Sequence, residues 1–93
     1  MADEKKEKAV PDPDQIGFFW TSEIDALYRE AAMSGSLDAV SELGREMQKQ
    51  GKQAQSPALL ETGEKLQRFA GKLDIQGVDH FLTVLESVAR KSR

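Results

Sequence analysis

The sequence LQRFAGKLDIQGVDHFLTVL, residues 66–85, decides the fold predicted for this chain. Leu66, Phe69 and Leu73 are spaced by three and four residues, so they fall on one face of a helix. A second apolar set with the same period follows, at Ile75, Val78, Phe81, Leu82, Leu85 and Val88. Two such faces joined by a short corner, from Lys72 to Gly77, predict an antiparallel helical pair.

The corner between the two apolar sets carries signals for a helix end and a helix start. Gly71 is suited to loosening the end of the first helix. Asp74 stands directly before the second set, where a carboxylate accepts hydrogen bonds from free backbone amides and complements the helix dipole. We therefore expect the final helix to run from Ile75 to about Arg90.

The first half of the chain is expected to hold two more helices. The first begins near Thr21 or Ser22, since either side chain can cap a helix, and it ends near Gly35. Ser36 caps the second, which runs from residue 37 to about residue 50. Their apolar residues again recur with a helical period.

The pair Ser56-Pro57 predicts the start of the third helix, because serine caps and proline is tolerated at the first helical position. The segment Gly51–Gln55 before it is expected to be a polar loop. Gly44 and Gly63 fall on inward helix faces, which favours a close crossing of helices there.

Four amphipathic helices with short connections predict an all-α fold, an antiparallel four-helix bundle built from two helical hairpins. Two hairpins packed at a steeper angle are the alternative. We expect one helical bundle domain at residues 15–93. Residues 1–14 are charged, lack an apolar period and contain two prolines, which predicts a disordered tail.

Composition limits the classes of function. The chain has 93 residues and no cysteine, which excludes disulfides and thiol chemistry. Its net charge is −3 and its basic residues are scattered, so we expect no nucleic-acid binding. No apolar run approaches the roughly 20 residues that cross a bilayer, and we expect a cytoplasmic protein without membrane attachment.

Catalytic and metal-binding patterns are missing from the sequence. One histidine and no cysteine make a zinc site improbable, and no glycine-rich phosphate loop occurs. The carboxylate pairs Glu42/Glu46 and Glu61/Glu64 lie among basic residues, which is typical of a solvated charged surface. We expect a protein that is not an enzyme and that has no cofactor and no metal.

An aromatic segment, Ile-Gly-Phe-Phe-Trp at residues 16–20, precedes the first predicted helix. Phe18, Phe19 and Trp20 are adjacent, so they cannot all share one helix face. The interpretation that we favour is a lid over the open end of the bundle. The alternative is an exposed aromatic patch that binds a protein partner or a second copy of the chain.

His80 lies nearly opposite the apolar stripe of the final helix, so we expect it to face solvent. A solvent-facing histidine on a helical bundle is what phosphoryl transfer from an aspartyl phosphate requires. A surface histidine without a role is the alternative.

Two short motifs resemble a known family. Gly35-Ser36-Leu37-Asp38-Ala39-Val40 is similar to the Gly-Asp-Leu-x-x-Leu helix opening of helical modules at the C-terminus of many bacterial hybrid sensor histidine kinases. Leu73-Asp74-Ile75-Gln76-Gly77-Val78, preceded by Leu66 and Phe69, resembles the way these modules close. The similarity spans about residues 24–86.

The resemblance implies a role in bacterial two-component signalling, with a histidine kinase or a receiver domain as the partner. Some relatives resemble histidine-phosphotransfer domains, in which lysine and glycine follow the histidine within about a turn. His80 is followed by Phe-Leu-Thr-Val instead. We therefore expect a non-catalytic protein-interaction or regulatory module. Phosphotransfer through His80 and a self-associating structural subunit are the alternatives.

Overall fold

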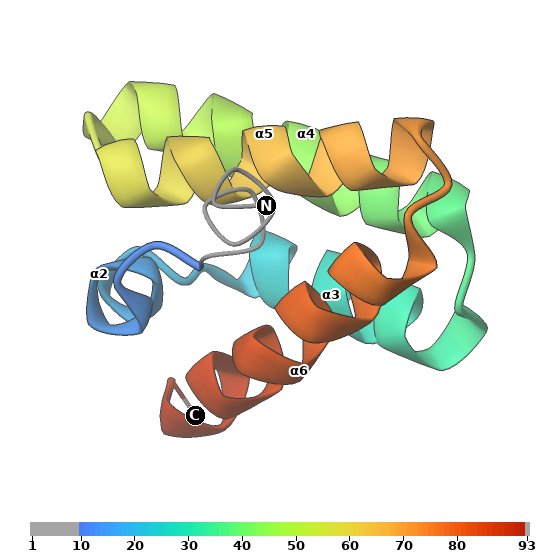
Figure 1. Ribbon diagram of the computed structural model, residues 1–93. Helices are drawn as coiled ribbons and strands as arrows, with labels where there is room; N and C mark the ends of the chain where they lie inside the picture. The colour runs from blue at the N-terminus through green and yellow to red at the C-terminus, as the bar shows by residue number, and fades with distance from the viewer. Residues whose placement is uncertain (1–9, 93) are drawn as a thin grey trace.

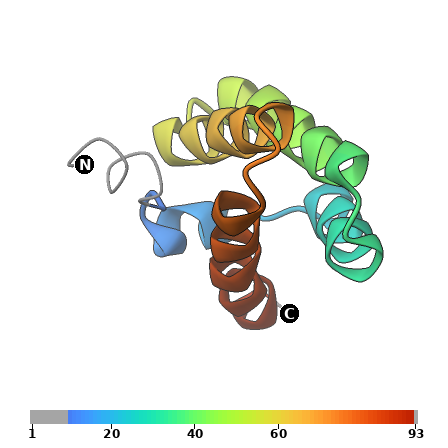
Figure 2. The same ribbon diagram turned by 45° about the vertical axis from the view of Figure 1, so that its right-hand side comes forward.

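The computed structural model describes residues 10–92, and within this range the chain forms five α-helices and no strand (Figure 1). The helices are α2 (Pro13–Phe18), α3 (Ser22–Ser34), α4 (Leu37–Ala54), α5 (Pro57–Gly71) and α6 (Ile75–Lys91). The all-α prediction is confirmed. Helices α4 and α5 lie side by side in one layer, and α2, α3 and α6 lie beneath them (Figures 1 and 2).

Each of the four long helices begins at a capping side chain that the sequence predicted. The capping oxygen accepts a hydrogen bond of 3.0–3.4 Å from the amide three residues further on, at Thr21, Ser36, Ser56 and Asp74. These bonds satisfy amides that have no partner within the helix. The predicted helix starts are therefore confirmed.

The corners α4–α5 and α5–α6 share one backbone design. Gln55 and Leu73 adopt the left-handed conformation, with φ of 55° and 59°. The next residue in each case, Ser56 or Asp74, donates its amide to the carbonyl five residues earlier, at 2.8 and 2.9 Å. This is the Schellman pattern of a helix end, and the same residue caps the following helix. One helix thus ends and the next begins without an intervening loop.

The exposure of this second corner differs from the prediction. Leu73 and Ile75 were expected on buried faces, but they are 69% and 56% exposed. Because the backbone of Leu73 is left-handed, its side chain does not continue the buried face of α5. Ile75 is the first residue of α6 and lies on the outside of the corner.

The pairing of the helices also differs from the prediction across residues 66–85. Helix α5 packs mainly against α4, and α6 turns away at a steep angle toward α2 (Figure 2). The antiparallel pair is therefore α4–α5. The reason lies in the glycines, which allow α4 and α5 to approach until their backbones touch.

A close crossing at Gly44 and Gly63 is confirmed. A Cβ atom built on Gly63 would lie 2.5 Å from the carbonyl oxygen of Gly44, so only glycine fits. Gly51 is buried in the same way, with the backbone nitrogen of Leu60 only 2.6 Å from the place of a Cβ atom. The predicted loop at residues 51–55 is consequently wrong, because α4 continues along α5 to Ala54.

The core lies between the two layers. Its largest fully buried side chains come from all five helices: Ile16, Ile24, Val40, Leu43, Met47, Leu59, Leu66, Phe69, Phe81 and Leu85. Phe69 and Phe81 meet edge to face, with ring centroids 5.2 Å apart. This contact fixes α6 against α5.

Helix α2 was not predicted. It starts with Asp12 as cap and Pro13 at the first position, and Ile16 is its one buried residue. The predicted disordered tail extended to residue 14, so its last two residues are helical in the structure. Residues 1–9 of that prediction lie outside the described residues.

None of the helices in the described range is long and apolar enough to span a membrane.

Candidate functional site

Trp20 is a structural residue of the aromatic segment. Its indole Nε1 donates a hydrogen bond of 3.1 Å to Oδ1 of Asp25, and its ring meets that of Tyr28 edge to face at 5.8 Å. Asp25 also pairs with Arg29 at 2.9 Å. Trp20 is half-buried and held on α3.

Phe18 has the opposite environment. It is 81% exposed, and its ring lies edge to face with that of Phe19, at 5.0 Å between centroids. Phe19 is half-buried. The structure therefore brings together two of the three predicted partner-binding residues and directs the third, Trp20, toward α3.

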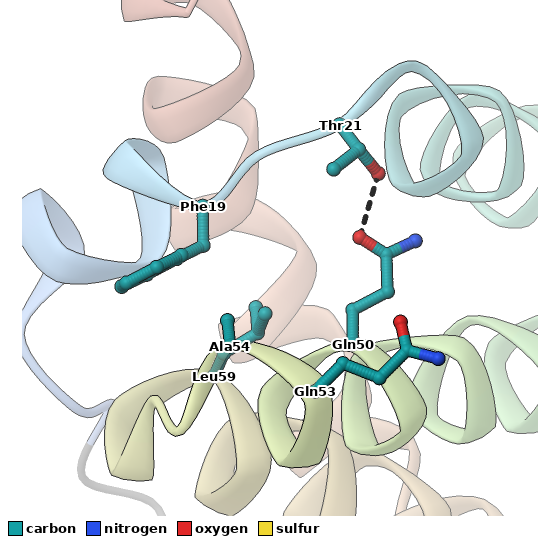
Figure 3. A pocket seen from close by; sticks show the side chains of 6 residues that line it. All are labelled: Phe19, Thr21, Gln50, Gln53, Ala54 and Leu59. Atoms are coloured by element: carbon teal, nitrogen blue, oxygen red, sulfur yellow. Dashed lines mark hydrogen bonds between the residues drawn. The ribbon is translucent and has the colours of Figure 1, made fainter.

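Phe19 forms one wall of an open pocket of about 300 Å³ (Figure 3). Ala54 and Leu59, at the corner between α4 and α5, lie opposite the ring, and Gln50 and Gln53 extend along α4 beside them (Figure 3). The pocket thus combines apolar surface with side-chain amides, as small binding sites commonly do.

The polar wall of this pocket, which we call the Phe19 pocket, is fixed by hydrogen bonds. The Thr21 hydroxyl donates to Oε1 of Gln50 at 2.9 Å (Figure 3), and Gln50 Nε2 donates to Oε2 of Glu46 at 2.9 Å. Thr21 also caps α3. A single side chain therefore fixes the start of α3 and the wall of the pocket together.

Two further depressions adjoin the Phe19 pocket along α4. One is lined by Glu23, Glu46, Lys49, Gln50 and Gln53, and the other by Arg45, Gln48, Lys49, Lys52, Gln53 and Gln67. The second lies over the α4–α5 crossing, where Gln48 Nε2 donates to Oε1 of Gln67. Gln53 belongs to the lining of all three.

His80 is exposed on α6, as predicted. Its ring centroid lies 6.1 Å from that of Phe81. The residues three and four positions away on α6 are Gln76, Gly77, Thr83 and Val84, so this face of the helix brings no cation beside the imidazole. His80 is not among the residues lining the Phe19 pocket or the two adjoining depressions.

Sequence reasoning missed the site residues on α4. Gln50 and Gln53 fell within or next to the predicted loop, and Lys49 was interpreted as part of a solvated charged surface. The available signal was the spacing of Arg45, Lys49 and Lys52, which puts three cations on one side of a helix. This spacing places the three cations together only if the helix continues beyond residue 50, where the prediction ended it.

Among residues 10–92, no three histidine or carboxylate side chains converge in a way that would hold a metal ion. In each of the pairs Glu42/Glu46 and Glu61/Glu64, one carboxylate forms an ion pair with a basic residue of its own helix. Glu42 pairs with Arg45 at 3.7 Å and Glu61 with Lys65 at 3.4 Å.

Comparison with protein-family models, curated proteins and solved structures gives no match to this chain.

Proposed function

We propose that this chain is a non-catalytic helical module that binds a protein partner through Phe18 and the adjoining Phe19 pocket. The observation that carries the proposal is the 81% exposure of Phe18 beside a pocket whose wall is fixed by hydrogen bonds. A large aromatic side chain exposed beside a preformed apolar pocket is typical of the centre of a protein interface.

The resemblance supplies the context of this proposal. It favours bacterial two-component signalling in the cytoplasm, with a histidine kinase or a receiver domain as the partner. The helical bundle would then act as a docking or regulatory element beside such domains.

Affinity capture tests the proposal. The bait is the chain itself, in lysate of a bacterium rich in two-component systems, with captured kinases and receivers quantified by mass spectrometry. Phe18→Ala should lower their recovery at least about tenfold, since an interface residue of this kind contributes about 2 kcal/mol or more. Met33→Ala is the matched control, because Met33 is 88% exposed at the end of α3, outside the Phe19 pocket and the depressions beside it.

Two results would contradict the proposal. One is equal recovery with the unmodified chain and with Phe18→Ala. The other is capture that contains no signalling protein, which would remove the two-component context.

Phosphotransfer through His80 is the second candidate, and the exposure of this residue on α6 favours it. A phosphorylated receiver should then label the chain but not His80→Gln. Equal labelling of the two proteins, or none, would exclude this function.

Self-association through Phe18 is a further alternative for the same patch. Sedimentation equilibrium distinguishes it, because a monomer at high concentration excludes a structural subunit of this kind.

A further inference from the structure

Three cationic side chains of α4 lie beside the Phe19 pocket. Arg45, Lys49 and Lys52 are spaced by four and three residues and are all exposed. Arg45 lies 3.7 Å from Glu42, whereas Lys49 and Lys52 form no ion pair within residues 10–92. Two lysines on one face, neither paired with a carboxylate of the described residues, form a site that attracts anionic groups.

This cationic face is continuous with the Phe19 pocket. Gln53 lines the pocket and both depressions beside it, and Lys49 lines the two depressions. Gln53 therefore links the surface beside Phe19 to the depressions that the lysines line. With a rise of about 1.5 Å per residue, the distance along α4 from Ala54 to Lys52 is about 3 Å, and to Lys49 about 8 Å.

The opposing charges on this surface are Glu23 and Glu46, which line the depression next to α3. Glu46 is engaged by the side-chain amide of Gln50. Positive charge therefore dominates only on the side toward α5, where Arg45, Lys49 and Lys52 line the depression without a carboxylate.

From this arrangement we infer that the partner presents a polypeptide segment with a large apolar side chain and, about 3 to 8 Å further along α4, two or more carboxylates. The apolar side chain occupies the Phe19 pocket beside Phe19, whose ring contacts Phe18, and the carboxylates pair with Lys49 and Lys52. This inference rests on the proposed function and adds the chemical class of the segment.

A polypeptide fits this surface better than a nucleic acid does. The whole chain has a net charge of −3, and Glu23 and Glu46 line the same depression as Lys49, where they would repel a phosphate backbone. A segment with a few carboxylates pairs with the lysines and avoids that repulsion.

Selection from a displayed library of random peptides, about twelve residues long, tests the inference on the purified chain. We expect selected peptides to combine a large apolar residue with at least two acidic ones. A selected peptide should bind about tenfold more weakly to Lys49→Glu/Lys52→Glu. It should also weaken as salt rises from about 50 to about 500 mM. The control Arg68→Glu/Lys72→Glu makes the same change in charge at the end of α5, outside the Phe19 pocket and the two depressions, and should change the affinity less than twofold.

The inference fails if the selected peptides are not enriched in acidic residues, if no peptide is selected, or if the lysine variant binds unchanged. It also fails if a labelled single-stranded DNA of about twenty nucleotides binds as tightly as the peptides. Binding that is lost in Phe18→Ala but unchanged in the lysine variant retains the proposed function and removes only this inference. Binding that neither change affects contradicts both.

Discussion

Gly44 and Gly63 place the backbones of α4 and α5 in direct contact. A Cβ atom on Gly44 would lie 2.8 Å from the carbonyl oxygen of Gly63, and one on Gly63 would lie 2.5 Å from that of Gly44. The relationship is reciprocal, so neither helix can accommodate a methyl group without moving the other. The backbone carbonyls cannot rotate away as a flexible side chain would.

Gly63→Ala should therefore lower the free energy of unfolding by about 2 kcal/mol, in the range found for overpacked cores. Chemical denaturation followed by circular dichroism measures this change. Gly71→Ala is the control, because nothing lies within 4 Å of its added methyl group. It should leave stability unchanged or raise it by up to about 1 kcal/mol. Equal effects of the two substitutions would mean that the close crossing does not determine stability.

The left-handed conformation at Leu73 predicts a stabilising substitution. A side chain in this conformation costs about 1–2 kcal/mol relative to glycine, and Leu73 is 69% exposed, so it loses little burial when removed. Leu73→Gly should raise the free energy of unfolding by about 1 kcal/mol in the same denaturation experiment.

Leu73→Ala separates the two contributions at this position, since alanine removes the side chain and keeps the conformational cost. It should not stabilise the protein. Gly35, with φ of 65°, supplies the reverse case, and Gly35→Ala should destabilise by about 1 kcal/mol. A destabilised Leu73→Gly variant would contradict this account of the corner.

Thr21 performs two roles with one hydroxyl group. It accepts from the amide of Ile24 at 3.2 Å and donates to Gln50 at 2.9 Å. Thr21→Val keeps the shape and loses both bonds, so we expect a loss of about 1–2 kcal/mol of stability. Thr21→Ser retains the hydroxyl and should lose less than half as much. If the two variants are equally stable, neither bond contributes measurably.

Substitutions of Phe18 and Trp20 should have different effects on stability. Trp20→Ala removes the contact with Tyr28 and the hydrogen bond to Asp25, and should lower the melting temperature through a loss of about 2 kcal/mol. Phe18→Ala removes an exposed ring and should change stability by less than about 0.5 kcal/mol. Differential scanning calorimetry of both variants checks this division. A Phe18→Ala variant as unstable as Trp20→Ala would show that Phe18 belongs to the folded core.

Much of the fold could be predicted from local rules. Ser36, Ser56, Pro57 and Asp74 mark helix starts because a cap is satisfied within four residues of its own position. The helical period of the apolar residues predicted the all-α class, and the small size of glycine predicted the close crossing of helices.

The parts that were missed depend on contacts distant in sequence. The side of α5 that meets α4 is chosen by Gly44, Gly51 and Gly63 acting together, so the spacing within residues 66–85 could not reveal it. Likewise, α2 is only six residues long, and its period is too short to recognise. The division of roles among the three adjacent aromatics depends on Asp25 and Tyr28, which period analysis does not connect to them.

The packing of α2 against α6 couples the two ends of the described chain. An isolated helix of six residues does not persist in water, so α2 exists because Ile16 is buried and because Gly17 lies close to Val88. Phe18, the last residue of α2, is thus oriented by a helix from the opposite end of the described chain. We therefore expect any event that displaces the end of α6 to unwind α2 and to move Phe18. Amide hydrogen exchange in α2 would therefore report on the state of α6.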